Sequence, residues 1–262
     1  MLAAVVPSVD GDVMLAAVVS PVDGESILVT VLVLLVALVH LLPEELPVPG
    51  EISRQALLSA AGGVSIVYAF LHLFPELDAR RESLDGIDFV LGSLTPQHVY
   101  AVVFVGLALF YGLERLAAVA RSRDVASLPD EPVFWVHVGG FTVYNAFIGY
   151  ALVQGETGTE GTLLFAIAMG FHLLGNDEAM ERHHPTLYRR FGRWALLTSV
   201  LAGAFVGAVY EIRASTFTIL LGLLTGGIIF NAIKDELPRT QESRFWAFVV
   251  GSGVYALLVL SL

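Results

Sequence analysis

The sequence predicts an all-α integral membrane protein with eight transmembrane helices and both termini on the extracytoplasmic side. Three observations predict this class: an apolar composition, eight apolar stretches of membrane-spanning length, and an uneven distribution of basic residues. Hydrophobic residues make up 56% of the 262 residues, charged residues only 15%, and the mean hydropathy is +0.74. Soluble domains contain about 25% charged residues, so we expect one compact membrane domain rather than a soluble globule.

The eight apolar stretches are close to the length of about 20 residues that a membrane-spanning helix needs. They cover residues 26–43, 54–74, 97–120, 132–154, 161–178, 192–211, 215–235 and 243–262. The fifth stretch is apolar only over 162–175, before the polar run Asn-Asp-Glu at 176–178. Because a polar end is costly in lipid, we expect this helix to be short and shielded inside the bundle.

Basic residues predict the orientation, since they favour the cytoplasmic connections of membrane proteins. With the amino terminus outside, the inner connections contain 11 of the 14 Lys and Arg residues, and the other three are Arg80, Arg81 and Arg213. This asymmetry agrees with an even number of helices. We therefore expect a multi-pass protein of the cell membrane.

The amino-terminal segment contains a near-exact duplication, MLAAVVPSVDG at 1–11 and MLAAVVSPVDG at 14–24. A secretory signal peptide needs a basic segment near its start, and no Lys or Arg precedes Arg54. Replication slippage or two alternative start codons explain the repeat. We interpret residues 1–25 as a mobile extracytoplasmic tail and residues 26–262 as the eight-helix membrane domain.

Composition also limits the partners. The chain has no cysteine, which excludes disulfides and thiolate metal sites. Its net charge is −11 and Lys234 is its single lysine, so we expect no nucleic-acid partner. The expected surroundings are the lipid bilayer.

The second and seventh stretches end in similar sequences, GGVSIVYAFLHLFPE at 62–76 and GGIIFNAIKDELP at 226–238. Each has a glycine pair, an alanine six or seven positions later and a proline six positions beyond that. The two helices run in opposite directions in the predicted topology, as in transporters built from inverted repeats. Glycine pairs for close helix packing also recur independently, so both explanations are open.

Isolated ionisable residues occur in the first three helices. His40 and His72 lie near helix ends, where we expect interfacial imidazoles. Glu114 lies in the inner part of the third helix beside Arg115, and we expect a structural role for it.

The fourth and fifth helices carry the richest set of polar residues. His137 and Tyr144 lie nearly on one face, and His172 and Asn176 share a face of the next helix. Imidazole, amide and carboxylate groups can bind a cation, and the candidates are His137, Asn145, His172, Asn176 and Asp177. The same groups could instead form interhelical hydrogen bonds. No His-Glu-x-x-His motif is present to decide between these interpretations.

Four motifs together resemble those of a known family. AFLHLFPE at 69–76 is similar to a helix-two ending of the Phe-Leu-His-Leu-Leu-Pro-Glu kind, and GGIIF…DELP at 226–238 closes helix seven in a similar way. Asn145 and Gly149 are placed as in a helix-four motif His-Asn-x-x-Glu-Gly, and His172 as in a helix-five motif His-Glu-x-Pro-Glu-Gly. In these motifs the chain resembles the ZIP (Zrt/Irt-like) divalent metal transporters.

The resemblance extends over all eight helices and implies a 3+2+3 arrangement with an inverted repeat. It also implies inward transport of a divalent cation, zinc foremost, by alternating access, and it is in keeping with a homodimer. No resident cofactor is expected. The metal ligands implied for this chain are Asn145, His172, Asn176, Asp177 and His137.

The departures from the family motifs fall on the metal ligands. Tyr144 and Ile148 stand where the helix-four motif has His and Glu, and Asn176 replaces a Glu of the helix-five motif. Amides and imidazoles alone carry little charge with which to hold a hard dication, although imidazole suits zinc.

Three functions are therefore open. The first is a ZIP-like metal transporter. The second is a ZIP-fold membrane protein that has lost metal transport and serves as a binding or scaffold protein, or carries another solute. An intramembrane zinc hydrolase ranks last, because no third helix supplies a clear catalytic partner, and we do not expect an enzyme.

Overall fold

The computed structural model describes residues 24–42, 53–89, 92–122, 131–155, 158–236 and 244–261. In chain order the helices, helical turns and strands are α2 (Gly24–Leu38), η1 (Val39–Leu41), α3 (Arg54–Tyr68), η2 (Ala69–Leu73), α4 (Phe74–Arg80), η3 (Arg81–Leu84), β1 (Ile87–Phe89), β2 (Gly92–Leu94), η4 (Pro96–His98), α5 (Val99–Ser122), α6 (Glu131–Gln154), α7 (Thr159–His183), α8 (Pro185–Leu187), η5 (Tyr188–Gly192), α9 (Arg193–Val209), α10 (Ala214–Asn231), η6 (Ala232–Glu236) and α11 (Phe245–Ser261). Apart from Gly24 and Glu25, which begin α2, the predicted tail lies outside the described residues.

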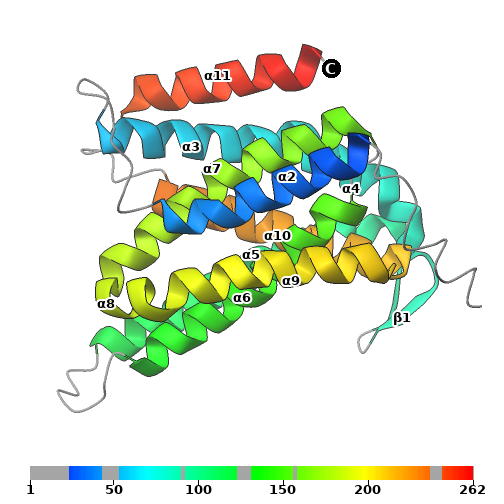
Figure 1. Ribbon diagram of the computed structural model, residues 1–262. Coiled ribbons are helices and arrows are strands. Elements are labelled where there is room, and N and C mark those ends of the chain that lie inside the picture. The colour runs from blue at the N-terminus through cyan, green and yellow to red at the C-terminus, as the bar shows by residue number, and fades with distance from the viewer. Residues whose placement is uncertain are drawn as a thin grey trace, which may run out of the picture.

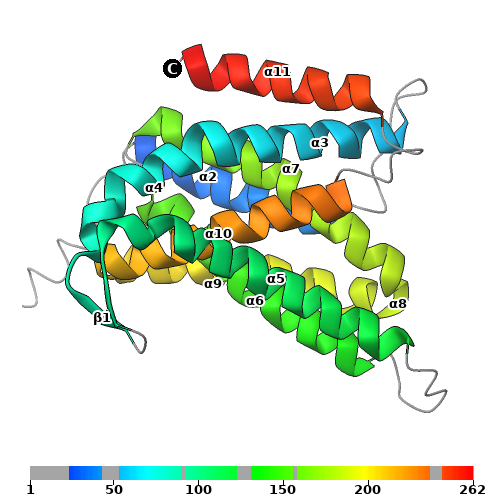
Figure 2. The ribbon, with the colours of Figure 1, turned by 180° about the vertical axis from the view of Figure 1, so that it is seen from behind.

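The chain folds as an all-α membrane protein in the part that the structure describes. Every predicted apolar stretch contains one long helix (Figures 1 and 2). Six helical segments are long and apolar enough to cross a membrane: Gly24–Leu41, Arg54–Leu84, Pro96–Leu116, Pro132–Gln154, Pro185–Val209 and Ala214–Lys234. The apolar helix α11 is shorter, at 17 residues. The sequence did not predict the small antiparallel hairpin β1–β2 between the second and third helices.

The second helix continues through a proline. Pro75 follows the π-helical turn η2, in which the Phe74 N–H donates to the carbonyl of Ala69. Proline lacks an N–H and its ring crowds the preceding turn. The wider π turn accommodates this, so the helix extends to Arg80 instead of ending at 74.

The fifth helix was predicted to be short, and this is wrong. Helix α7 has 25 residues and reaches His183. It continues because its polar end is paired: Glu178 accepts from Arg54, and Glu181 accepts from Arg189 at 2.8 Å. Most of α7 is buried, as expected for an inner helix.

Close backbone contact joins α6 to α9. A side chain at Gly149 would collide with the backbone of Val200, and one at Gly203 would collide with that of Ala146. Glycines allow the same approach of α5 to α10, at Gly106 and Gly226, and of α3 to α11. The bundle therefore contains three tightly packed helix pairs.

The paired helices run in the same direction. Along α6 and α9, Phe134 lies opposite Gly192 and Tyr150 lies opposite Gly207. The residue numbers of contacting positions therefore increase in the same direction along both helices. The chain between them must therefore return through the bundle, and it does so as α7. A helix of 25 residues is about 37 Å long.

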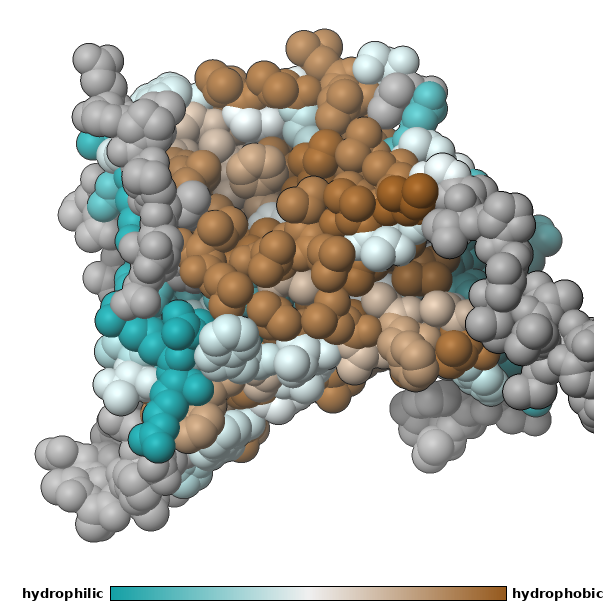
Figure 3. Space-filling view, viewed as in Figure 1, coloured by the Kyte–Doolittle hydropathy of each residue, from teal (hydrophilic) through white to brown (hydrophobic). Residues whose placement is uncertain are grey.

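The two ends of the bundle differ in chemistry. Figure 3 shows a broad hydrophobic surface over the middle of the molecule, with hydrophilic side chains gathered toward the end that carries α8. We call this the arginine-rich end, after Arg54, Arg182, Arg189 and Arg193. The opposite end carries the hairpin β1–β2 (Figure 1), and we call it the hairpin end.

Candidate functional site

A chain of buried polar side chains lies where α2 and η1 meet α6 and α7. It consists of His40, Tyr144, Asn145, His172, Asn176 and Asp177, none of which is more than 6% exposed. We call this set the polar seam. Ionisable groups enclosed at membrane depth are costly, and they mark pathways or relays more often than packing.

His40, at the end of the first helix, is fully buried among its neighbours. Its Nδ1 lies 2.7 Å from Oδ2 of Asp177, and its Nε2 lies 3.1 Å from Oδ1 of Asn145. The turn η1 carries this ring inward from the end of α2. His40 thus connects the two helices on which the sequence placed the candidate ligands.

The orientation of Asn145 fixes the protons on His40. Its Nδ2 donates to the carbonyl of Phe141 at 2.8 Å, so Oδ1 faces the imidazole. An amide oxygen only accepts, and Nε2 of His40 must therefore carry a proton. Its Nδ1 faces the Asp177 carboxylate, so the two side chains form a buried pair.

A second centre forms around His172. Its Nε2 lies 2.8 Å from the hydroxyl of Tyr144 and 3.1 Å from Nδ2 of Asn176. Both partners point at the same ring nitrogen, so a metal ion bound at this nitrogen would have to displace them. The Tyr144–His172 contact brings the fourth and fifth predicted helices together at this point.

The structure divides the five predicted ligands into three groups. Asn145 and Asp177 both contact His40, whereas His172 and Asn176 contact each other. His137 lies apart, with its Nε2 at 3.8 Å from Oε2 of Glu114. Within the described ranges, no group of three or more His, Cys, Asp or Glu side chains is placed to hold a metal ion.

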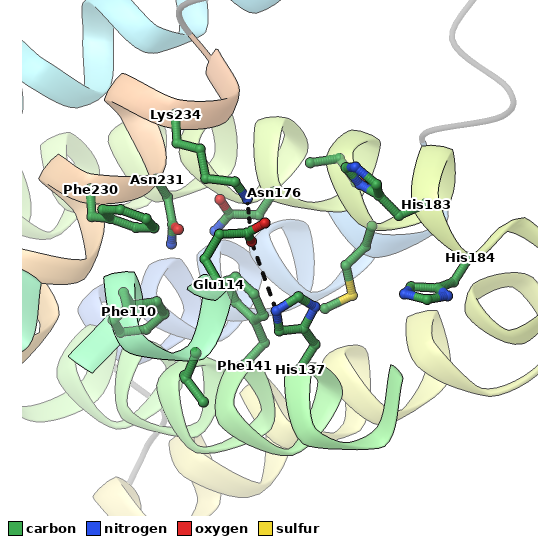
Figure 4. A pocket seen from close by; sticks show the side chains of 13 residues that line it. Phe110, Glu114, His137, Phe141, Asn176, His183, His184, Phe230, Asn231 and Lys234 are labelled. Atoms are coloured by element: carbon green, nitrogen blue, oxygen red, sulfur yellow. Dashed lines mark hydrogen bonds and ion pairs between the residues drawn. The ribbon is translucent and has the colours of Figure 1, made fainter. Parts of the chain in front are cut away.

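A small cavity opens beside the seam toward the arginine-rich end. Its volume is about 30 Å³, room for about two water molecules. Figure 4 shows its polar lining side chains: Glu114, His137, Asn176, His183, His184, Asn231 and Lys234. We call it the inner cavity. Asn176 belongs to both the seam and the cavity and so connects them.

Glu114 is the acidic centre of the inner cavity. Its Oε2 accepts from Nζ of Lys234 at 2.6 Å, and the same oxygen is the one that faces His137. Figure 4 shows the side chains of Glu114, His137 and Lys234 extending from α5, α6 and η6 toward one another. All three side chains are partly shielded, with exposed fractions of 12% to 29%.

Two amides in the cavity have a polar atom without a partner among the described residues. They are Oδ1 of Asn176 and Nδ2 of Asn231, on residues 4% and 2% exposed. Such a group costs about 1–3 kcal/mol when it is buried unpaired. The orientation of an amide is assigned from its contacts, but one end of Asn176 stays unpaired in either orientation.

Sequence reasoning missed the roles of His40, Glu114 and Lys234. Their partners are distant in sequence, since His40 contacts residues 105 and 137 positions away. The available signal was the cost of an ionisable residue in an apolar stretch, which applies to His40 and Glu114 equally.

Comparison of the sequence with protein-family models and with curated proteins finds no match.

Proposed function

We propose that this protein is a multi-pass membrane transporter for a divalent metal cation. The observation that carries the proposal is the buried polar seam, which continues through Asn176 into the inner cavity. Polar and ionisable side chains enclosed in a membrane bundle are typical of ion pathways. The resemblance to ZIP transporters supplies the class of substrate, with zinc as the first ion to test.

The packing supports eight membrane crossings and alternating access. Because α6 and α9 are parallel, α7 has to run the other way between them, although its polar end lowers its hydropathy. The basic residues at the arginine-rich end support a cytoplasmic location for that end. The polar seam then lies among α2, α6 and α7, of which only α6 belongs to a glycine-packed pair.

Transport is tested by zinc uptake into proteoliposomes that contain the purified protein and an internal fluorescent zinc indicator. We expect saturable uptake by the natural protein and loss of most of it in the His172→Ala, Asn176→Ala double variant. Val143→Ala is the control, because Val143 is 72% exposed next to the seam residue Tyr144. Equal flux in empty liposomes would refute transport of zinc.

A second candidate function is a ZIP-like fold that has lost metal transport. The observation that favours it is the Tyr144 hydroxyl, which occupies the ring nitrogen of His172. Adding Tyr144→Phe to the uptake assay separates the two functions. If His172 binds transported metal, removing the hydroxyl should preserve or raise uptake. If the seam only holds helices together, neither the natural protein nor this variant should exceed empty liposomes.

A further inference from the structure

We propose a cation-binding site in the inner cavity, formed by Glu114, His137 and Asn176, in which the ammonium of Lys234 is a built-in competitor for a first-row divalent cation. This site deepens the proposed transport function and rests on it for its role as a station on the pathway. Whether the site binds a cation is independent of transport, and an equilibrium binding measurement tests it directly.

Two of the three proposed ligand atoms already lie close together. Oε2 of Glu114 lies 3.8 Å from Nε2 of His137, and the amide of Asn176 lines the same cavity. A carboxylate oxygen, an imidazole nitrogen and an amide oxygen are N and O donors suited to Zn²⁺, Co²⁺ or Mn²⁺. Three protein ligands with water at a remaining position make an open metal site.

Glu114 supplies the negative charge that the family-like positions lack. Ile148 and Asn176 stand where carboxylates are expected from the resemblance, and within the seam the Asp177 carboxylate is already paired with His40. A dication stripped of part of its water needs a carboxylate nearby. In this chain that carboxylate comes from α5.

Lys234 holds the position that a metal ion would take. Its ammonium contacts the same Glu114 oxygen at 2.6 Å and so neutralises the site with a tethered cation. The side chain is 29% exposed, and a lysine carries its charge on a flexible four-carbon stem. It can therefore turn toward the cytoplasmic water when a divalent cation replaces it.

The backbone at Lys234 also departs from regular helix. Lys234 lies in η6, a π-helical turn that directly follows α10. Single π turns inside or at the end of a helix are frequent at functional sites. The cavity volume of about 30 Å³ has room for an ion with one or two waters.

The buried amides point to a polar occupant. Oδ1 of Asn176 and Nδ2 of Asn231 both lack a partner among the described residues, and both residues line this cavity. A hydrated cation satisfies both groups. The Asn176 oxygen coordinates the ion, and the Asn231 N–H donates a hydrogen bond to a water molecule beside it.

The test is Co²⁺ binding to the purified protein in detergent, followed by the visible absorption of the bound metal and by displacement with Zn²⁺. Lys234→Met removes the ammonium and keeps an apolar stem, whereas Lys234→Arg keeps the charge. Relief from one nearby positive charge should make Lys234→Met bind at least about tenfold more tightly than the natural protein. Lys234→Arg should show no such gain.

Adding Glu114→Gln to Lys234→Met should abolish the gain. Equal affinity in Lys234→Met and the natural protein, or tight binding that survives Glu114→Gln, would overturn the site. If Lys234→Met does not fold, acetylation of the single lysine in the folded natural protein neutralises the same charge. Tight Co²⁺ binding without zinc uptake would keep this site and reject the proposed transport, so the two failures are distinguishable.

Discussion

At the scale of single residues, His40 has the largest structural consequence. Its ring joins α2 to Asp177 of α7 and Asn145 of α6, and neither residue of the His40–Asp177 pair is more than 1% exposed. A buried pair is costly to break, because the remaining partner keeps the penalty of burial without its compensation.

We expect His40→Ala and Asp177→Ala each to lower the free energy of unfolding by about 3–5 kcal/mol. The double variant should lose clearly less than the sum, because both single losses include the breaking of the same His40–Asp177 contact. Unfolding in mixed detergent and SDS measures all three. Thr30→Ala is the control on the same helix, since Thr30 is exposed and its hydroxyl donates only to Ser26 within α2. Additive losses would contradict a coupled pair.

The sequence identified part of the seam and missed its connecting residue. The four-residue spacing placed His172 and Asn176 on one face of the fifth helix, because helix periodicity acts locally. Position alone placed His40 at a membrane surface. Its burial depends on how α2 packs against α6 and α7, which local periodicity does not encode.

At the scale of helices, the glycine contacts determine how closely the bundle packs. Gly149 and Gly139 lie on the same helix α6, but only Gly149 meets backbone atoms of another helix. A Cβ at Gly139 has no atom of another segment within 4 Å. This pair therefore offers a matched comparison.

Gly149→Ala should destabilise the protein by about 1–3 kcal/mol, because the methyl group forces α6 and α9 apart. Gly139→Ala should be neutral or slightly stabilising, since alanine is the better helix former. Thermal unfolding in detergent compares the two. Similar losses in both variants would mean that the α6–α9 contact is not a tight one.

Helix positions were predictable where apolar runs are long, and helix ends were not. Polar residues at 176–178 indicated an end to the fifth helix, yet ion pairs to Arg54 and Arg189 extend α7 to His183. Pro75 likewise suggested an end, and the π turn before it removed that barrier. In both cases a contact or a local rearrangement outweighed the local signal.

At the scale of the whole molecule, the proposed topology places the two ends of the bundle on opposite sides of the membrane. The chain has no cysteine, so a single introduced cysteine can report each side and no native cysteine has to be removed first. Asp85 at the hairpin end and Thr186 at the arginine-rich end are both exposed.

In intact cells, a membrane-impermeant maleimide should label Asp85→Cys and should label Thr186→Cys only after permeabilisation. The expectation follows from the excess of basic residues on the cytoplasmic side. A reversed pattern would invert the orientation, and labelling of both in intact cells would rule out opposite sides. Glu25→Cys, at the start of α2, should behave like Asp85→Cys if two membrane crossings separate them.

The pairing of His40 with Asp177 has an electrical consequence for the proposed transport. The membrane potential does work of about 2.3 kcal/mol per elementary charge for each 100 mV crossed. A divalent cation that crossed beside this pair, as the proposed function requires, would experience that work twice over, so a negative interior would favour inward movement of the ion.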